Sequence, residues 1–304
     1  MSHPFAHPSS ELLLASVEKV LFDKPVYQRM DRHIVFVCGG AVGPRKKSAR
    51  NGFLRYAVHA LPQFRVFLAE AATKDLVQFN DPQFVNLAEF ENLVADIADC
   101  ILIFPETPGS IAEVGYFSAS VKTVRKILIA NDIRRQQESF INLGPIDLIN
   151  QNSFFKPVIH IRRPPIEEDF RAIRDRLTSR LPTKNAKKLE LEKGVSLAVR
   201  ERFFMVFEII NIFRILTIDS LVYCMCKFFG DQDKKIIGHM LSVLCAARYL
   251  DRHGDDSQYF SPSTTAGSFL EFRGSDINKI KVSIVQHYAL HHPESASLIK
   301  GSGI

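Results

Sequence analysis

A continuous apolar run that leads into a turn and a helix start constrains the fold of this chain more than any other stretch. Residues Ile101 to Phe104 are all apolar, as expected of a strand covered on both faces in a parallel sheet. Pro105 ends the run, and Pro108-Gly109-Ser110 then supplies a turn with Ser110 as a candidate helix N-cap. The pattern predicts a strand-to-helix junction in an open α/β sheet, where ligands bind at the carboxyl ends of strands.

Two acids flank this turn. Glu106 lies in the loop, and Glu113 follows Ser110 by three residues, where the carboxylate of a capping box would sit. A helix N-terminus offers unpaired N–H groups to polar or anionic ligands, so both carboxylates are candidates for a ligand site. The alternative is that Glu113 only caps its helix and Glu106 is a solvated loop acid.

Further apolar runs alternate with helical patterns along the first 180 residues. They read as strands at residues 33–38, 64–70, 126–130 and 156–161. Strands that alternate with helices predict a doubly wound parallel sheet, and therefore an α/β fold. The first strand ends at Cys38 and runs into Gly39 and Gly40, which permit either a bare tight turn or the close approach of a ligand.

The segment after these glycines is basic and opens a helix. Ser48 is the predicted cap, and Arg50 follows it in the first turn. Cationic side chains and helix N–H groups both favour negative charge, so Ser48 and Arg50 are expected to hold a phosphate of the substrate. A solvated basic loop is the alternative. The fingerprint G-x-G-x-x-G is absent, which argues against the usual dehydrogenase turn.

A chain of 304 residues is long enough for two domains, and the pattern changes after a linker-like segment at residues 181–188. We expect one domain over residues 1–182 and a mainly helical one over 183–304. Three helices at residues 195–213, 218–229 and 234–250 precede a hairpin near 248–262, an order that resembles a winged helix-turn-helix. The third helix and the hairpin would then contact nucleic acid through Lys234, Lys235, Arg248 and Arg252. A protein-docking role is the alternative.

Composition places the chain among globular proteins, with 46% hydrophobic and 24% charged residues. We expect no membrane association, because no apolar run has the length of a membrane span, and a cytoplasmic location, because the start lacks a secretory signal pattern. The five cysteines are odd in number and three lie in apolar runs, so reduced, buried thiols are expected. The pair Cys224-x-Cys226 lacks zinc-ligand spacing, so no metal site is expected, and we expect no cofactor. The formal charge of +6 permits a nucleic-acid partner without requiring one.

The strand, the acidic loop, Gly109-Ser110 and Glu113-Val114-Gly115 together resemble the nucleophile segment of the nucleoside 2-deoxyribosyltransferase-like superfamily. The resemblance implies that Glu113 attacks or stabilises the anomeric carbon of a nucleoside, with Glu106 orienting a hydroxyl or assisting proton transfer and Ser110 among the substrate contacts. Members carry a sugar-binding acid about eight residues before the Asp that opens the catalytic strand, which implies Glu91 if Asp99 is that residue. Related phosphoribohydrolases carry Pro-Gly-Gly-x-Gly-Thr-x-x-Glu, which residues 108–113 match only in part.

A deoxyribosyltransferase-like domain joined to a winged-helix-like domain resembles the effector subunit of type II bacterial retrons. The resemblance implies a toxic anti-phage effector that cleaves the N-glycosidic bond of a nucleotide such as NAD. It also implies restraint by a reverse transcriptase and its branched RNA–DNA product (msDNA), together with self-association into a homo-oligomer. Two alternatives stay open: a ligand-sensing nucleic-acid-binding protein without catalysis, and a nucleotide phosphoribohydrolase.

Overall fold

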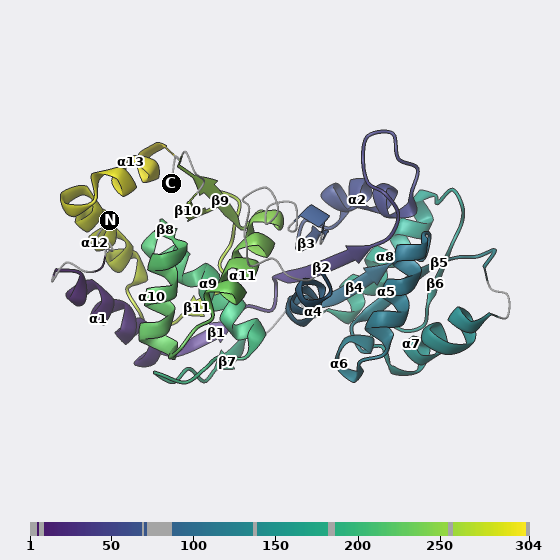
Figure 1. The fold of residues 1–304 in the computed structure, drawn as a ribbon, viewed down its shortest axis with the longest axis horizontal. Coiled ribbons are helices and arrows are strands. Elements are labelled where there is room, and N and C mark those ends of the chain that lie inside the picture. Colours follow the sequence, from purple (N-terminus) through teal and green to yellow (C-terminus); the bar gives the residue numbers. More distant parts are fainter. Residues whose placement is uncertain are drawn as a thin grey trace. The chain divides into compact units, whose positions relative to one another are not determined.

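The computed structural model describes residues 5, 9–68, 70–71, 87–135, 139–181, 186–254 and 258–301 (Figure 1). These residues form two compact units. The α/β unit contains the described residues between 31 and 181, and the helical unit contains those before 31 and after 185. Each unit has its own sheets and its own core.

The N-terminal segment corrects the expected domain limits. Residues 9–30 belong to the helical unit and not to the domain expected over residues 1–182. The helix α1 (Ser9–Phe22) contacts α12 (Ile277–His291), and β1 (Val26–Gln28) pairs with strands from the C-terminal part of the chain. The α/β unit therefore begins only where the chain enters the parallel sheet. Residues 182–185 of the expected linker lie outside the described residues.

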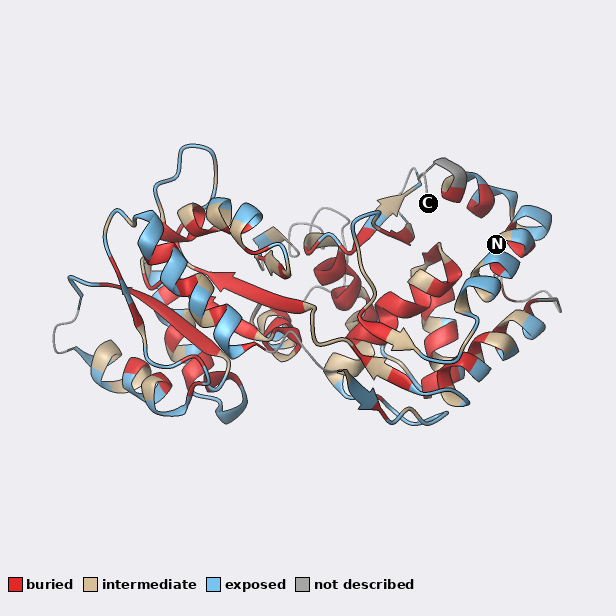
Figure 2. Cartoon of the chain, turned by 180° about the vertical axis from the view of Figure 1, so that it is seen from behind, coloured by how far each residue is buried: buried red, intermediate tan, exposed pale blue. Residues whose placement is uncertain are grey.

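A five-stranded parallel sheet forms the centre of the α/β unit, which confirms the α/β class. Its order is β3-β2-β4-β5-β6, and neighbouring strands are parallel throughout. The strands are β2 (His33–Cys38), β3 (Phe64–Phe67), β4 (Cys100–Ile103), β5 (Ile127–Asp132) and β6 (Ile159–Ile161). Every residue of β2, β4 and β5 is buried, as Figure 2 shows in red, because helices cover the sheet.

Helices lie on both faces of this sheet. On one face, α2 (Ala49–Ala60) and α8 (Glu167–Arg180) contribute to a core with alternate residues of β2 and β4. On the other face, Phe117 of α5 (Pro108–Ser118) packs edge-on against Phe36 of β2, with ring centroids 6.1 Å apart. The helix α4 (Leu87–Ile97) also packs against β2. The short helices α6 (Val121–Val124), η1 (Asn142–Ile146) and α7 (Asp147–Asn152) lie in the connections on either side of β5.

The helical unit contains the three expected helices and the expected hairpin. They are α9 (Val199–Phe213), α10 (Ile218–Phe229), α11 (Lys234–Ala246) and the strands β9 (Leu250–His253) and β10 (Tyr259–Pro262). The strand β8 (Leu216–Thr217) joins this hairpin in an antiparallel sheet of order β8-β10-β9. Residues 255–257 of the hairpin lie outside the described part of the chain.

A second small sheet of the helical unit was not expected from the sequence. It has the order β11-β1-β7, with β7 (Lys187–Leu189) and β11 (Leu270–Phe272) antiparallel to β1. Each of these strands has only three residues, too few for an alternating pattern to be recognised. The helix α13 (Pro293–Gly301) follows α12. Among the described residues, no helix has the length and apolar content required to span a bilayer.

A buried acid links α9 to the start of β11 in the helical unit. Glu208 of α9 accepts hydrogen bonds through Oε1 from the N–H groups of Phe269 (2.6 Å) and Leu270 (3.1 Å) and from the Ser268 hydroxyl (2.6 Å). Asn211 donates to its other oxygen at 3.1 Å. Burial raises the pKa of Glu208, and these donors oppose that rise. The carboxylate thereby fixes the start of β11 against α9.

Replacing Glu208 by Ala should destabilise the helical unit. The substitution leaves the buried N–H of Phe269 without its acceptor and leaves that of Leu270 with the Ser268 hydroxyl alone, so the free energy of unfolding should fall by about 1 to 3 kcal/mol. Chemical denaturation followed by circular dichroism measures the loss. Glu201→Ala on the same helix, where the side chain is half-buried, is the control and should change stability by less than about 1 kcal/mol. Equal effects of the two variants would contradict the anchoring role of Glu208.

Candidate active site

The sheet order has a switch point between β2 and β4 in the α/β unit. The strand β3 lies on one side of β2, and the later strands β4, β5 and β6 lie on the other. At such a switch point the connections leave toward opposite faces of the sheet and open a ligand crevice at the strand ends. Cys38 ends β2 at this point, and the turn from Phe104 to Thr107 leads from β4 into α5.

The start of α5 differs from the expectation in a way that changes the role of Glu113. Thr107, not Ser110, is the N-cap: its hydroxyl accepts from the N–H of Ser110 at 3.2 Å. Ser110 completes the capping box, because its hydroxyl accepts from the N–H groups of Thr107 (2.9 Å) and Glu106 (3.0 Å). Ser110 is therefore engaged within the turn, and Glu113 is not needed as a helix cap.

Glu113 carries a buried carboxylate oxygen that is not satisfied. Its Oε2 has no hydrogen-bond partner in the part of the chain that the structure describes. The pKa of Glu113 is raised to about 7, by burial first and by the charges of Glu91 and Glu70 next. Arg50 and a hydrogen bond with Cys38 lower it. A carboxyl group that changes charge near neutral pH and keeps an unused oxygen is typical of an active site.

Glu91 and Glu70 form an acidic cluster with Glu113. Burial first, and the charge of Glu70 second, raise the pKa of Glu91 on α4. Burial, followed by the charge of Glu113, raises the pKa of the Cys38 thiol, which is therefore protonated at neutral pH and can donate a hydrogen bond. The structure thus brings the expected Glu91 and Glu113 to one site. Glu70 was missed, although its place at the carboxyl end of a predicted strand was a usable signal.

Glu106 has a structural role instead of the expected one. Its carboxylate accepts hydrogen bonds from the N–H groups of Gly40 (2.9 Å), Ala49 (2.9 Å) and Arg50 (3.1 Å). Arg163 donates to it at 2.6 Å, and the side chain is only 5% exposed. Because both oxygens are engaged, Glu106 anchors the turn after β2 to the start of α2 and is not available to orient a sugar hydroxyl.

The two glycines after β2 serve this packing. A Cβ on Gly40 would lie 2.8 Å from Cβ of Ser48 and 3.0 Å from Oε1 of Glu106. Gly39 has φ +154°, and a Cβ there would lie 2.9 Å from Cβ of Arg50. Both positions were expected to let a ligand approach the backbone. In the structure they let α2 and Glu106 approach it.

Ser48 and Arg50 are likewise engaged within the protein. Ser48 caps α2, as expected, by accepting from the N–H of Asn51 at 3.1 Å, and its hydroxyl donates to the carbonyl of Ala41 at 2.7 Å. Arg50 is 5% exposed, and its guanidinium makes two hydrogen bonds to Glu70, at 2.8 and 3.2 Å. Neither side chain is placed to hold a phosphate, because their polar atoms are used elsewhere.

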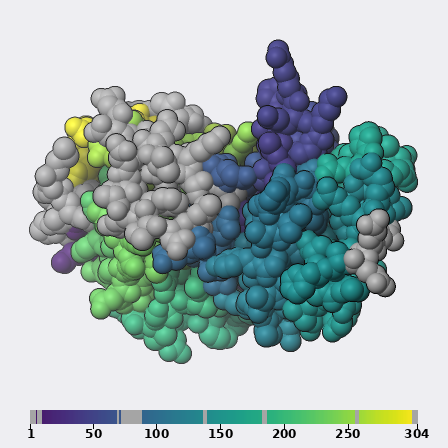
Figure 3. Space-filling view, turned by 45° about the vertical axis from the view of Figure 1, so that its right-hand side comes forward, coloured from purple at the N-terminus to yellow at the C-terminus, as the bar shows by residue number. Residues whose placement is uncertain are grey.

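Exposed cations lie instead on the loop between β2 and α2. Arg45, Lys46 and Lys47 are exposed, and the loop stands out from the surface in Figure 3. The buried amide of Asn51 braces it by donating to the carbonyls of Gly43 (2.9 Å) and Lys46 (2.6 Å). The loop therefore presents three adjacent positive charges from a supported backbone.

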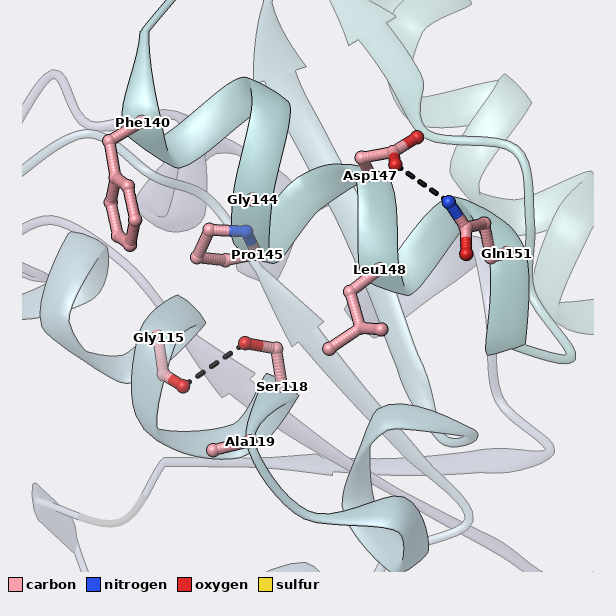
Figure 4. A pocket seen from close by; sticks show the side chains of 9 residues that line it. All are labelled: Gly115, Ser118, Ala119, Phe140, Gly144, Pro145, Asp147, Leu148 and Gln151. Carbon is pink, nitrogen blue, oxygen red and sulfur yellow. Dashed lines mark hydrogen bonds between the residues drawn. The ribbon is translucent and has the colours of Figure 1, made fainter.

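A hollow of about 500 Å³ lies on another face of α5 (Figure 4). It is lined by Gly115, Ser118, Ala119, Phe140, Gly144, Pro145, Asp147, Leu148 and Gln151. Residues two apart on a helix point roughly 200° apart, so Gly115 does not share the face of Glu113. The acid of this hollow, Asp147, accepts a hydrogen bond from Gln151 at 2.7 Å. The hollow is therefore separate from the acidic cluster around Glu113.

The candidate nucleic-acid contacts of the helical unit form two pairs. Lys234 and Lys235 begin α11, and Lys234 forms an ion pair of 2.5 Å with Asp219. Arg248 follows α11 and is exposed, and Arg252 on β9 lies 5.1 Å from the ring centroid of Phe260. The 13 residues of α11 separate the pairs by about 20 Å.

Removing the Glu106 carboxylate should loosen the turn between β2 and α2. Glu106→Ala leaves three N–H groups without their acceptor and Arg163 with only its longer ion pair to Asp132 (3.7 Å), so we expect the free energy of unfolding to fall by about 3 to 5 kcal/mol. Hydrogen–deuterium exchange should report loss of protection over residues 39–52. Glu168→Ala, an exposed acid on α8, is the control. Unchanged exchange in the Glu106 variant would disprove the anchor.

The fold and the site define an α/β protein with an acidic cluster at the switch point of a parallel sheet, and comparison with known proteins gives its family. The family model of the STM3845 retron effector protein matches residues 46–252, which lie in both units. The chain belongs to the STM3845 retron effector family. The resemblance to retron effectors is thus confirmed at the level of the family.

Two relatives from Escherichia coli agree with this assignment. The protein of retron Ec73 is 27% identical over 237 residues, which cover 72% of this chain and 74% of the relative. The protein of retron Ec86 is 31% identical over 118 residues, which cover 38% and 37%. Both are named as candidate ribosyltransferase/DNA-binding proteins.

Proposed function

We propose that this retron effector is an N-glycosidase that cleaves the bond between ribose and base in a nucleotide, with NAD as its substrate. The observation that carries the proposal is Glu113, whose buried oxygen has no partner among the described residues and whose pKa is about 7. The position at a switch point, where α/β proteins bind ligands, supports it. The names of both relatives, which include ribosyltransferase, support a reaction at the anomeric carbon.

The mechanism follows from the charge of the site. Ionised Glu113 faces C1′ while the C1′–N bond breaks, and the bonding electron pair leaves with the base. The positive charge that develops on C1′ and the ring oxygen is stabilised by the carboxylates around it. In NAD the leaving nitrogen is a cationic pyridinium, so nicotinamide departs neutral without taking up a proton. Water then adds to C1′ and gives its proton to a carboxylate of the cluster.

Two further groups complete the proposed substrate site. The charge of Glu91 acts on Glu113, and the charge of Glu70 acts on both. In the proposed complex, Glu91 accepts a hydrogen bond from a ribose hydroxyl. The diphosphate meets the cations at residues 45–47, since Ser48 and Arg50 are engaged within the protein. A nucleoside monophosphate consumed in preference to NAD would favour the phosphoribohydrolase alternative.

The Glu113→Gln variant should abolish release of nicotinamide. The amide keeps the volume of the side chain but carries no charge to stabilise the transition state, so the rate should fall by roughly a thousandfold or more. Chromatography of NAD incubated with the protein and its retron partners measures free base. Glu168→Gln serves as control and should retain the parent rate. Parent-like cleavage by Glu113→Gln would contradict the assignment.

The reaction should depend on pH through Glu113. An acid whose pKa is raised to about 7 is mostly protonated below that pH and mostly ionised above it. Because the ionised form is the reactive one, kcat/KM should rise with pH through a midpoint near 7 and fall about tenfold per pH unit on the acidic side. A rate profile between pH 5 and 9 tests this. A midpoint near the ordinary value of a glutamic acid would contradict it.

We propose that the helical unit is a winged-helix-like domain that binds nucleic acid. The order α9-β8-α10-α11-β9-β10, with β8 and β9 on either side of β10, supports this reading. The basic residues Lys234, Lys235, Arg248 and Arg252 would bind nucleic acid, in keeping with the DNA-binding part of the relatives' names. The branched RNA–DNA product and the reverse transcriptase of the retron would restrain the effector, which would act as a homo-oligomer. A protein that bound this nucleic acid but never released free base would favour the non-catalytic alternative.

A further inference from the structure

The carboxylate of Glu106 fixes Arg50 directly and through Gly40. Oε1 of Glu106 accepts the backbone N–H of Arg50 at 3.1 Å and that of Gly40 at 2.9 Å. The carbonyl of Gly40 in turn accepts a hydrogen bond from Nε of Arg50 at 2.6 Å. Arg50 is thereby fixed at its backbone N–H and at its Nε, within the turn that the buried carboxylate of Glu106 organises.

The free end of this guanidinium fixes Glu70. Nη2 and Nη1 of Arg50 donate to the two carboxylate oxygens of Glu70 at 2.8 and 3.2 Å, which is the two-point contact that only arginine can make. The side chain of Glu70 is 55% exposed and that of Arg50 is 5% exposed. Without the buried partner, an exposed glutamate would spread over several rotamers in solvent. The pair therefore keeps the Glu70 charge in one place.

That place is beside the reacting group. Glu70 follows β3, Cys38 ends β2 and Glu113 lies in the helix that follows β4, so all three gather at the carboxyl edge of adjacent parallel strands. The charged and titratable groups that act on Glu113 come from four elements around it: Glu91 of α4, Glu70 after β3, Arg50 of α2 and Cys38 of β2. Glu70 is also the charge that acts on Glu91.

We propose that Arg50 and Glu70 are a positioning pair for the reaction at Glu113: the turn locked by Glu106 fixes Arg50, Arg50 fixes Glu70, and Glu70 supplies a third negative charge to the site. Glu70 touches neither the substrate nor the reacting atoms. It acts by raising the pH at which Glu113 ionises and by adding negative charge where the ribose becomes positive. The effect on the reaction rests on the proposed function, whereas the effect on the ionisation of Glu113 does not.

The titration of Glu113 tests the proposal without any substrate. Carbon-13 NMR of glutamate carboxyls, assigned with Glu113→Gln, gives the midpoint in the full-length protein. In Glu70→Gln the midpoint should move to lower pH, because a negative neighbour is lost, while Glu70→Asp should retain most of the parent value. Glu89→Gln is the matched control, an exposed acid of α4 that is not among the charges acting on Glu113, and it should leave the midpoint unchanged.

A double-mutant cycle tests the part played by Arg50. Arg50→Lys keeps the positive charge but cannot make the two-point contact, so Glu70 is released and the Glu113 midpoint should fall in the same direction. The double variant Arg50→Lys/Glu70→Gln should show no further fall, because both changes remove one interaction. Strictly additive shifts, or a Glu70→Gln midpoint equal to the parent value, would overturn the proposal. Amide NMR spectra that stay native-like establish that each variant is folded.

The pH dependence of NAD cleavage separates this proposal from the function on which it rests. If the protein is a glycosidase, the acidic limb of kcat/KM in Glu70→Gln should move by the same amount as the NMR midpoint of the free protein, with KM little changed. A fall in kcat at all pH values without this displacement would make Glu70 a merely structural residue and overturn the proposal. If the NMR midpoint moves but no variant and no parent protein releases base, the positioning of Glu113 stands and the N-glycosidase function fails.

Discussion

A single buried carboxylate organises the carboxyl edge of the parallel sheet. Glu106 accepts three backbone N–H groups from the turn after β2 and the start of α2, and it forms an ion pair with Arg163. Backbone groups in such a turn have no ladder or helix partner, and a burial without acceptors would cost free energy at each of them. The carboxylate of Glu106 accepts all three of these N–H groups. The position of the neighbouring Arg50, and through Arg50 that of Glu70, therefore depends on Glu106.

Glu106, in the loop after β4, and Glu113, in the helix that follows, are two acids in different environments. Glu106 has donors for both oxygens, which stabilise its charge. Glu113 lies further along the chain, in α5, and burial and acidic neighbours raise its pKa while one oxygen stays without a partner among the described residues. A carboxylate whose oxygens all accept hydrogen bonds stabilises the fold. A buried carboxylate with an unused oxygen still has lone pairs with which it can bind or react with a ligand.

The connection between the two units also has a simple physical basis. Among the described residues, the chain leaves the helical unit after β1 and returns to it in β7, and these two strands are hydrogen-bonded neighbours in one antiparallel sheet. The α/β unit therefore begins and ends at adjacent points of the helical unit. An insertion between paired strands leaves the core of the host unit intact, because the two ends are already close together.

The sequence by itself determined the parallel sheet and most helix positions, because apolar runs of strand length are local signals. Glu113 was a candidate from its spacing after the central strand, and Glu91 only from the resemblance to deoxyribosyltransferases. The sequence did not determine the domain limits, the cap of α5, the role of Glu106 or the place of Glu70. Those depend on contacts between residues such as Glu106 and Gly40, or Arg50 and Glu70, which are far apart in the chain. Only the tertiary structure decides which acids find donors and which are left unsatisfied, since that outcome rests on which strand ends meet at the edge of the sheet.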